Sequence, residues 1–322
     1  MNLRNFIHTF FHPFETIAAI VYSQSAITTS TLRQALFEQR ASCLTEKTIY
    51  SRELGISSEK MCSEEVIVSL TSYGKRIHDA YLAIESIMQG SVKPNRIILW
   101  LSEEEFGKKD LPITLQKQQV RGLEIKYCKD IRSYKKLVYT LKEYPEACII
   151  TIDDDLIYNF DLVENLLNRH KQNPSYICAS RIHQITKNSD GSIKKYLDWN
   201  SCVGNDTPES DLNFFTTGGG TLFPPHAFPK ETFDEDSFTS ICPTADDVWF
   251  NAMTRLKGTK ICKSFTHSPK GEDFVVNEKL QIDGLGAINN APKNNQNDVQ
   301  IKAVFEKYGI KIHTSNNILK KK

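Results

Sequence analysis

The chain has 322 residues, of which 40% are hydrophobic and 25% are charged, and its formal net charge is +1 at pH 7. This composition is typical of a folded, water-soluble protein, and a net charge near zero gives no reason to expect a nucleic-acid partner. The length allows one large α/β domain with an added segment, or two smaller domains. The eight cysteines are scattered and include no C-x-x-C pair, which predicts reduced core residues of a cytoplasmic protein, without a disulfide framework or a zinc site.

Residues 1–62 are predicted to form an N-terminal helical extension. Apolar residues recur at helical spacing from Phe6 to Val21, but His8 and Pro13 interrupt them. No stretch reaches the roughly 18 uncharged apolar residues of a membrane span, and no signal-peptide cleavage site is present. Two interpretations stay open: the segment packs on the body of the protein or on a second copy, or it binds peripherally at the inner face of the cell membrane.

From residue 63 onward, strand and helix patterns alternate. Three apolar runs are predicted strands, at 66–70, 96–101 and 123–127. One helix is predicted between Asp79, which can cap its start, and Gly90, and another over 133–144. This alternation predicts a parallel sheet with right-handed crossovers, in which ligands bind at the carboxyl ends of the strands.

A fourth apolar run, 148–152, is followed directly by Asp153, Asp154 and Asp155. If strand geometry continues, Asp153 and Asp155 face one way and Asp154 faces the other. Converging carboxylates repel one another, and a divalent cation with oxygen ligands relieves the repulsion. Asp153 and Asp155 are therefore predicted metal ligands. The alternative is a solvated acidic turn, with Asp161 capping the helix that follows.

The second half departs from this rhythm. Short extended pieces are predicted at 176–180, 181–186 and 193–199, and residues 188–191 have hairpin chemistry. Three consecutive glycines, 218–220, interrupt the apolar run 214–225, which predicts a buried bend or a close approach to the backbone.

A pair of acids, Asp246 and Asp247, follows Thr244, which is predicted to cap a helix. Carboxylates in a first turn gain from the helix dipole, so capping alone could explain one of them. Two acids beside Trp249 are more than a cap needs, and the pair is a candidate catalytic site.

Taken together, these motifs resemble GT-A-type glycosyltransferases, and the bacterial family-2-like enzymes that build capsule or lipopolysaccharide sugars are the best match. The resemblance covers roughly residues 65–270, about two thirds of the chain. It is carried by four motifs in order: Ser69-Leu70-Thr71-Ser72-Tyr73 ending a strand, Asp153-Asp154-Asp155 ending another, the glycine-rich strand, and Ala245-Asp246-Asp247 opening a helix. The resemblance implies a GT-A-like open mixed α/β sheet, with a donor half at about 63–160, an acceptor half at about 161–280 and a C-terminal loop and helix at 281–322.

The resemblance also implies a metal-dependent hexosyltransferase. The expected donor is a nucleotide-sugar, with a UDP-sugar favoured, and the expected acceptor is a hydroxyl of a glycan or lipid-linked glycan in surface polysaccharide synthesis. Mn²⁺ or Mg²⁺ is expected to bridge the acidic motif and the donor diphosphate. The family more often has Glu-Asp where this chain has Asp246-Asp247, which leaves open which of the two acts as the catalytic base.

Each candidate residue has a chemical reason for its predicted role. A cation at Asp153 and Asp155 stabilises the charge that develops on a leaving diphosphate, while Asp154 is expected to face the sugar or the scaffold. Asp247 is the predicted base for an inverting transfer, with Asp246 as the alternative. The remaining candidates are Thr71 and Ser72 for hydroxyl contacts, Tyr73 to stack on a base, Arg76 and Lys135 for phosphates, and His267 as a third metal ligand.

Two other classes of protein stay as alternatives. A haloacid-dehalogenase-like phosphatase or phosphotransferase also places D-x-D after a strand, but it would have Thr or Val where this chain has Ile157 and would carry the motif on its first strand. A non-enzymatic divalent-cation module of the EF-hand type would need a glycine soon after its acidic ligands, where this chain continues with apolar residues. The polar segment 284–298 is a candidate lid that orders when a donor binds.

Overall fold

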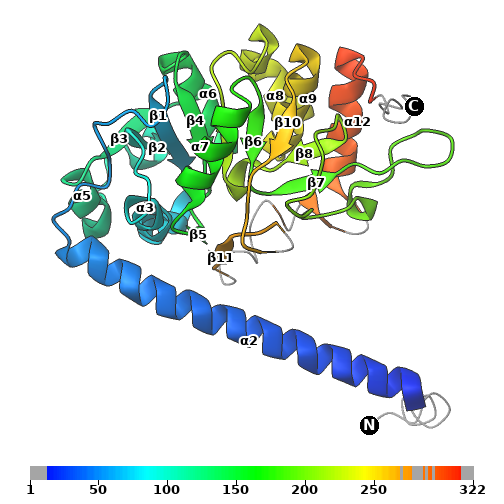
Figure 1. The fold of residues 1–322 in the computed structure, drawn as a ribbon, viewed down its shortest axis with the longest axis horizontal. Helices are drawn as coiled ribbons and strands as arrows, with labels where there is room; N and C mark the ends of the chain where they lie inside the picture. Colours follow the sequence, from blue (N-terminus) through cyan, green and yellow to red (C-terminus); the bar gives the residue numbers. More distant parts are fainter. Residues whose placement is uncertain (1–12, 269–270, 278–285, 287–288, 292–293, 313–322) are drawn as a thin grey trace.

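The computed structural model describes residues 13–268, 271–277, 286, 289–291 and 294–312 (Figure 1). Within these residues the largest sheet has seven strands in the order β10-β6-β9-β4-β1-β2-β3. Its strands are β1 (Val66–Thr71), β2 (Arg96–Ser102), β3 (Leu123–Cys128), β4 (Cys148–Thr151), β6 (Ile177–Ala179), β9 (Thr221–Phe223) and β10 (Ile261–Lys263).

One half of this sheet is parallel, as the alternation of strands and helices predicts. Strands β4, β1, β2 and β3 are hydrogen-bonded neighbours in parallel register. Strand β9 lies between β4 and β6 and is antiparallel to both, so β4 and β6 run in the same direction. The open mixed α/β sheet is therefore confirmed, and the carboxyl ends of β1, β4 and β6 meet at one edge.

Successive side chains of the central strand feed two hydrophobic cores, one on each face of the sheet. Ile150 packs with Ile84 and Leu166, whereas its neighbour Ile149 packs in the core that contains Trp249. This division follows from the twofold alternation of side chains along a strand. The helices on the first face are α3 (Ala80–Met88) and α7 (Leu162–Gln172). Those on the second face are α6 (Lys135–Glu143), α9 (Asp246–Lys257) and α12 (Gln296–Tyr308). Three shorter helices are α4 (Glu103–Phe106), α5 (Ile113–Gln119) and α8 (Glu235–Ile241).

The predicted helix caps are corrected by the structure. Asp79 and Asp161 do occupy the N-cap positions of α3 and α7, but neither side chain bonds the helix backbone. Asp161 instead accepts a contact from His267. At α9 the N-cap residue is Ala245, because the Thr244 hydroxyl donates to the Asn289 side chain.

The N-terminal part forms one long helix, α2 (Pro13–Tyr50), which extends well beyond the rest of the molecule in Figure 1. At 1.5 Å per residue its 38 residues span about 57 Å. It contacts the body through its C-terminal part, where Arg40 Nη2 donates to the Tyr158 carbonyl at 2.9 Å and Thr48 Oγ1 to buried Glu85 at 3.1 Å. None of the described helices is long and apolar enough to cross a bilayer. Residues 1–12 of the predicted amphipathic segment lie outside the described residues.

The middle of the chain forms smaller sheets. Strand β7 (Ile182–Gln184) pairs antiparallel with β8 (Asn213–Phe215). The hairpin that was expected between residues 181–186 and residues 193–199 is therefore reduced to isolated bridges, such as the one between Lys187 and Ile193. The predicted turn is present, and Gly191 adopts a φ of 85° in it. Two further strands, β5 (Leu156–Tyr158) and β11 (Phe274–Val276), pair antiparallel beside the acidic turn.

Candidate functional site

A cavity of about 660 Å³ opens at the carboxyl edge of the parallel strands. This volume lies within the range of about 300–1,000 Å³ that is usual for small-ligand sites. All of the predicted site residues except His267 line it. The loop after β1, the acidic turn after β4 and the first turn of α9 therefore border one space, as the rule that ligands bind at this edge of a sheet predicts.

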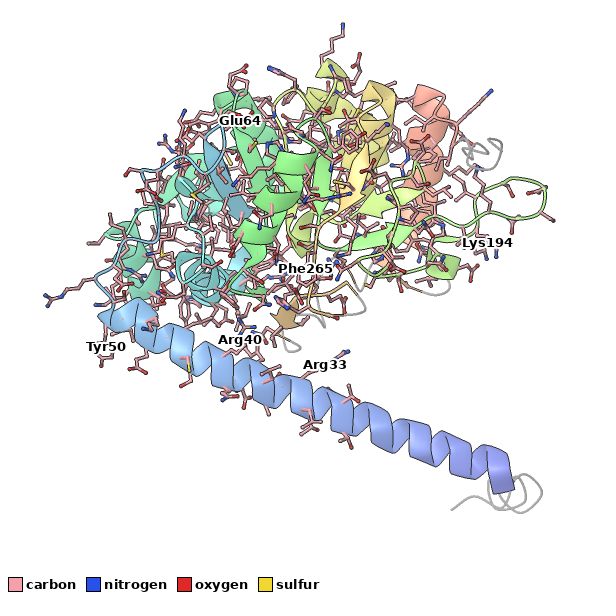
Figure 2. The ribbon with its side chains drawn as sticks, viewed as in Figure 1. Arg33, Arg40, Tyr50, Glu64, Lys194 and Phe265 are labelled. Carbon is pink, nitrogen blue, oxygen red and sulfur yellow. The ribbon has the colours of Figure 1, made fainter. Side chains whose placement is uncertain are left out.

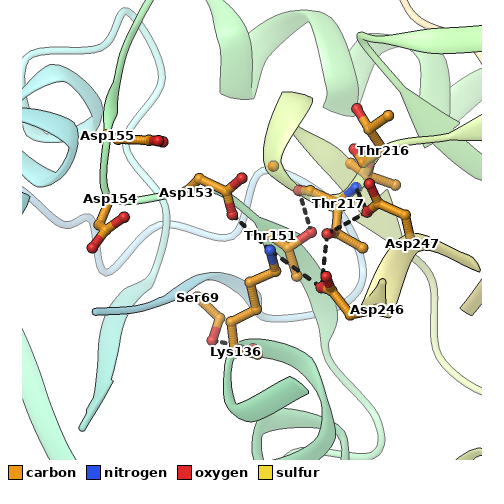
Figure 3. A network of polar contacts seen from close by, with 12 residues as sticks. Ser69, Lys136, Thr151, Asp153, Asp154, Asp155, Thr216, Thr217, Asp246 and Asp247 are labelled. Atoms are coloured by element: carbon orange, nitrogen blue, oxygen red, sulfur yellow. Dashed lines mark hydrogen bonds and ion pairs between the residues drawn. The ribbon is translucent and has the colours of Figure 1, made fainter. Parts of the chain in front are cut away.

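The acidic turn does not keep strand geometry. Strand β4 ends at Thr151, two residues before the first acid, and the Asp153 backbone N–H donates to the Tyr158 hydroxyl at 2.7 Å. The expected alternation, in which Asp153 and Asp155 face one way, is therefore not seen, since Asp154 and Asp155 share Arg76 as their ionic partner, while the assignment of Asp153 and Asp155 as metal ligands stays a prediction. Figure 3 shows Asp153 turned away from the other two, toward Lys136.

Lys136, in the first turn of α6, connects the two acidic motifs. Its ammonium group lies 2.6 Å from Asp153 Oδ1 and 3.3 Å from Asp246 Oδ2, and the side chain is only 3% exposed. Burial alone would lower the pKa of this lysine, but the neighbouring carboxylates, Asp153 and Asp246 foremost, outweigh burial and raise the pKa. Lys136 is thus a permanent buried cation between the acidic turn and α9 (Figure 3).

Replacing Lys136 by Met is expected to lower the free energy of unfolding by about 3–5 kcal/mol, because two carboxylates would lose their buried partner. Urea unfolding measures the loss. Lys135→Met is the matched control: Lys135 is equally buried, but its partner Asp130 is 46% exposed, whereas Lys136 binds Asp153, which is 38% exposed, and also Asp246, which is 11% exposed. That pair is expected to contribute about 1 kcal/mol or less. Equal losses in the two variants would contradict the central role given to Lys136.

Thr217 holds the two acids of α9 in different environments. Its backbone N–H and its hydroxyl each lie 2.7 Å from Asp247 Oδ1, and the hydroxyl lies 3.0 Å from Asp246 Oδ2. Asp246 also faces Lys136 at 3.3 Å, whereas Asp247 makes no salt bridge within 4.0 Å among the described residues and feels Lys136 only at longer range. Burial, followed by the charge of Asp246, raises the pKa of Asp247 to about 6.

The glycine run forms the predicted buried bend, a single 3-10 turn over Thr217–Gly219 between β8 and β9. A Cβ atom on Gly218 would lie 1.7 Å from Asp153 Oδ2, and one on Gly219 would lie 2.5 Å from the Arg181 Cβ atom. The Tyr158 hydroxyl donates to the Gly218 carbonyl at 2.6 Å. The absence of side chains therefore lets the bend pass directly behind the acidic turn.

Gly218→Ala is expected to displace the Asp153 carboxylate, since the added methyl group would overlap it. Overpacking of this kind costs about 1–3 kcal/mol of folding stability. The metal-dependent nucleotide binding that is proposed below should weaken in parallel, which calorimetry with and without Mn²⁺ measures on the folded variant. Normal metal-dependent binding would show that Asp153 has no part in it.

The residues predicted after β1 lie at the cavity, but two of their polar groups are already engaged. Thr71 Oγ1 donates to the Trp100 carbonyl at 2.8 Å, and Ser72 Oγ donates to Asp154 at 2.6 Å. Arg76 is bound by Asp154 and Asp155 and lies against the Tyr73 ring, which is 46% exposed. Tyr73 thus offers an open ring face, whereas Arg76 would have to exchange partners to reach a phosphate.

Burial raises the pKa of Asp154 to about 7, against the opposing effect of Arg76. Burial would also raise the pKa of Asp153, but Lys136 more than offsets this and the pKa is lowered. The pKa values of Asp153 and Asp154 are therefore shifted in opposite directions. Asp153 is firmly ionised, and Asp154 is partly protonated.

The structure does not bring His267 to the cavity. Its Nε2 atom lies 2.5 Å from Asp161 Oδ2, and its backbone N–H donates to Asp273 at 2.7 Å. Asp161 raises the pKa of His267, which favours an ion pair. The prediction that His267 completes a metal site with Asp153 and Asp155 gains no support from this placement.

Several cavity residues were missed by the sequence prediction, among them Arg181, His183 and Tyr196. Arg181 donates to Thr216 Oγ1 at 2.6 Å and contributes to lowering the pKa of Asp153. It follows the end of β6 by two residues, so the strand-edge rule could have found it. His183 belongs to the short strand β7 and Tyr196 to a 3-10 turn over Tyr196–Asp198, and neither stands directly after the end of a strand, so this rule could not have found them.

The acidic turn offers a divalent cation oxygen ligands, the donor set that Mg²⁺ and Mn²⁺ prefer. Its carboxylates are divided between two cations, since Lys136 binds Asp153 while Arg76 binds both Asp154 and Asp155. Cations that bind phosphates usually take only one or two carboxylates and complete their shell with phosphate oxygens and water. The arrangement fits a cation shared with a bound diphosphate better than one held by protein alone.

The fold and the cavity define an α/β protein with a polar ligand site at the carboxyl edge of its sheet. No protein-family model and no curated protein matches the sequence. Among solved structures, the chain is similar to a mannosyltransferase from Pyrobaculum calidifontis in complex with GDP-Man and Mn²⁺, with 12% sequence identity. The match covers 78% of this chain and 69% of that chain at a TM-score of 0.43, and a likeness this distant carries no argument about activity.

Proposed function

We propose that this chain is a metal-dependent glycosyltransferase that moves a sugar from a nucleotide-sugar to a hydroxyl group of a glycan. The observation that supports it best is that two acidic motifs line the same cavity. The acidic turn after β4 is bound by buried Lys136 through Asp153. The first turn of α9 presents Asp247, whose pKa is raised to about 6. A donor diphosphate needs the first motif with a cation, and an acceptor hydroxyl needs the second as a base.

The residues of the chain divide the work of an inverting transfer. Asp247 accepts the proton of the acceptor hydroxyl as its oxygen bonds to the anomeric carbon. The bond between that carbon and the diphosphate oxygen breaks, and its electron pair leaves with the diphosphate. Asp153 and Asp155 would hold the divalent cation, which would supply charge neutralisation for the leaving diphosphate. Lys136 keeps Asp246 charge-compensated, so Asp247 is the acid left to act as base.

The described part of the candidate lid supports a role in binding. Gly286, Asn289, Asn290 and Asn297 line the cavity, and Asn289 exchanges hydrogen bonds with Thr244 just before α9. Residues 284–285, 287–288 and 292–293 lie outside the described residues. Proteolysis with and without nucleotide tests the lid, and unchanged cleavage within 284–298 would argue against it.

A donor screen tests the function. The protein is incubated with Mn²⁺ and a panel of UDP-, GDP- and CMP-sugars, and nucleotide release is measured with and without glycan acceptors. We expect release from one donor, with UDP-sugars the favoured group, and dependence on the cation. No release from any donor, and no thermal shift with UDP or GDP, would overturn the proposal. Phosphate release from phosphomonoesters instead would favour the phosphatase alternative.

A further inference from the structure

Two cysteines, a histidine and a glutamate meet at the amino end of β4, on the opposite edge of the sheet from the cavity. Cys148 is the first residue of β4, Cys62 and Glu64 lie in the connection that enters β1, and His170 belongs to α7. One ligand atom of each lies within 4.8 Å of all the others. Because a strand rises about 3.3 Å per residue, the cluster is on the order of 15 Å from Asp153.

The distances within this cluster match a tetrahedral zinc site. Zn–S bonds of about 2.3 Å and Zn–N bonds of about 2.0 Å at tetrahedral angles place neighbouring ligand atoms about 3.5 Å apart. Cys148 Sγ lies 3.4 Å from His170 Nε2, and His170 Nε2 lies 3.7 Å from Glu64 Oε2. The four groups thus already surround a space of the right size.

Two side-chain atoms of the cluster, Glu64 Oε2 and His170 Nδ1, are buried without a hydrogen-bond partner among the described residues. Glu64 Oε2 has no hydrogen-bond partner among the described residues, and its separation from His170 Nε2 is too long for a hydrogen bond. Buried polar atoms of this kind call for a missing partner, such as an ion.

We propose that Cys62, Glu64, Cys148 and His170 bind a zinc ion. Thiolate and imidazole ligands select this metal over the hard cations that carboxylates alone would hold. Four protein ligands leave no coordination position for a substrate, which is the mark of a structural site. The ion fastens the connection between α2 and the sheet to β4 and α7. Figure 2 shows Glu64, one of the proposed ligands, on the far side of the domain from α2.

The ligands come from three separate elements, and this explains why the cysteine spacing predicts no zinc site. The proposal goes beyond the transferase activity and does not depend on it. A chain that binds zinc here and transfers no sugar would leave the zinc site intact and overturn only the proposed function.

Elemental analysis of the full chain, purified without metal-chelating resin, tests the proposal. We expect one zinc per chain, and replacement by Co²⁺ should give the intense visible bands of a tetrahedral site with thiolate ligands. Chelation should lower the melting temperature, because binding of the ion contributes to folding. No zinc and no cobalt spectrum would overturn the proposal, and so would a Cys62–Cys148 disulfide in the purified protein, detected by mass spectrometry.

Variants locate the ion. Cys62→Ser and Glu64→Gln, both at partly exposed positions, should weaken zinc retention and reduce the effect of chelator on the melting temperature. Two matched controls should keep full zinc content: Cys43→Ser on exposed α2, and Cys262→Ser, whose sulfur lies 3.4 Å from that of Cys178 in a pair outside the cluster. Normal zinc content in Cys62→Ser and Glu64→Gln, or loss in the controls alone, would refute the assigned ligands.

Discussion

Asp247→Asn is expected to bind the nucleotide-sugar and the metal normally and to lose transfer by about 10²- to 10⁴-fold, the usual contribution of a general base. Asparagine keeps the shape of the side chain, so it still accepts hydrogen bonds from Thr217. It removes the proton acceptor. Calorimetry with donor and Mn²⁺, together with steady-state rates, separates binding from transfer.

The same residue should set the pH dependence of the wild-type protein. A base works only when deprotonated, and burial with the charge of Asp246 raises the pKa of Asp247 to about 6. We therefore expect kcat/KM to rise with pH up to about 6 and then level off. In the Asp247→Asn variant, the rise of kcat/KM with pH should disappear. If the residual activity of this variant still rises with pH in the same way, the pKa belongs to another group.

Asp246→Asn is the comparison that distinguishes the two acids. Asp246 faces Lys136, so its replacement should mainly lower stability and should retain more transfer than Asp247→Asn does. The exposed Asp206, which is not part of the cavity lining, provides a control in Asp206→Asn. If Asp247→Asn transfers sugar normally and Asp246→Asn does not, then Asp246 is the base and the roles proposed for the two acids are reversed.

Asp155→Ala is expected to abolish the metal-dependent part of donor binding. Loss of groups that merely support a metal ligand already weakens metal affinity by about 10- to 100-fold, and loss of a ligand should do at least as much. Donor affinity is measured at several Mn²⁺ concentrations and again in chelator. We expect the variant to show the same weak affinity throughout, whereas the wild type gains affinity with Mn²⁺.

Removal of Asp155 also releases Arg76 from one of its carboxylates, and a second variant separates this effect. Arg76→Met with Asp155 intact should lower donor affinity both with and without Mn²⁺ and should retain a response to the cation. A normal Mn²⁺ response in Asp155→Ala would remove Asp155 from the metal site and leave Asp153 as the remaining predicted ligand.

The parallel strands could be predicted from the sequence because their apolar runs are short, buried and bounded by clear turns. Cys148–Thr151 is the plainest case, since the run is apolar and three acids follow it. The rule that ligands bind at the carboxyl ends of strands then placed Thr71 and Asp153 on one cavity. This inference needs only strand direction, which local pattern supplies.

The partner of each side chain could not be predicted in the same way. The alternation of Asp153 and Asp155 assumed that the strand continues, but it ends at Thr151, and Lys136 and Arg76 then determine where the acids point. These pairs join residues 17 or more positions apart along the chain, and no local pattern encodes them. The zinc ligands proposed at Cys62 and His170 were hidden for the same reason.

The position of β9 has a consequence for the order in which the molecule can be assembled. Strand β9 pairs with the edge of β4 on one side and with the edge of β6 on the other. Both of these strands are synthesised before β9, which begins 73 residues after the start of β4. Until β9 arrives, the apolar edge of β4 has open backbone groups that could pair with another chain. A nascent or truncated chain ending before Thr221 is therefore exposed to aggregation at the very strand that leads into the acidic turn.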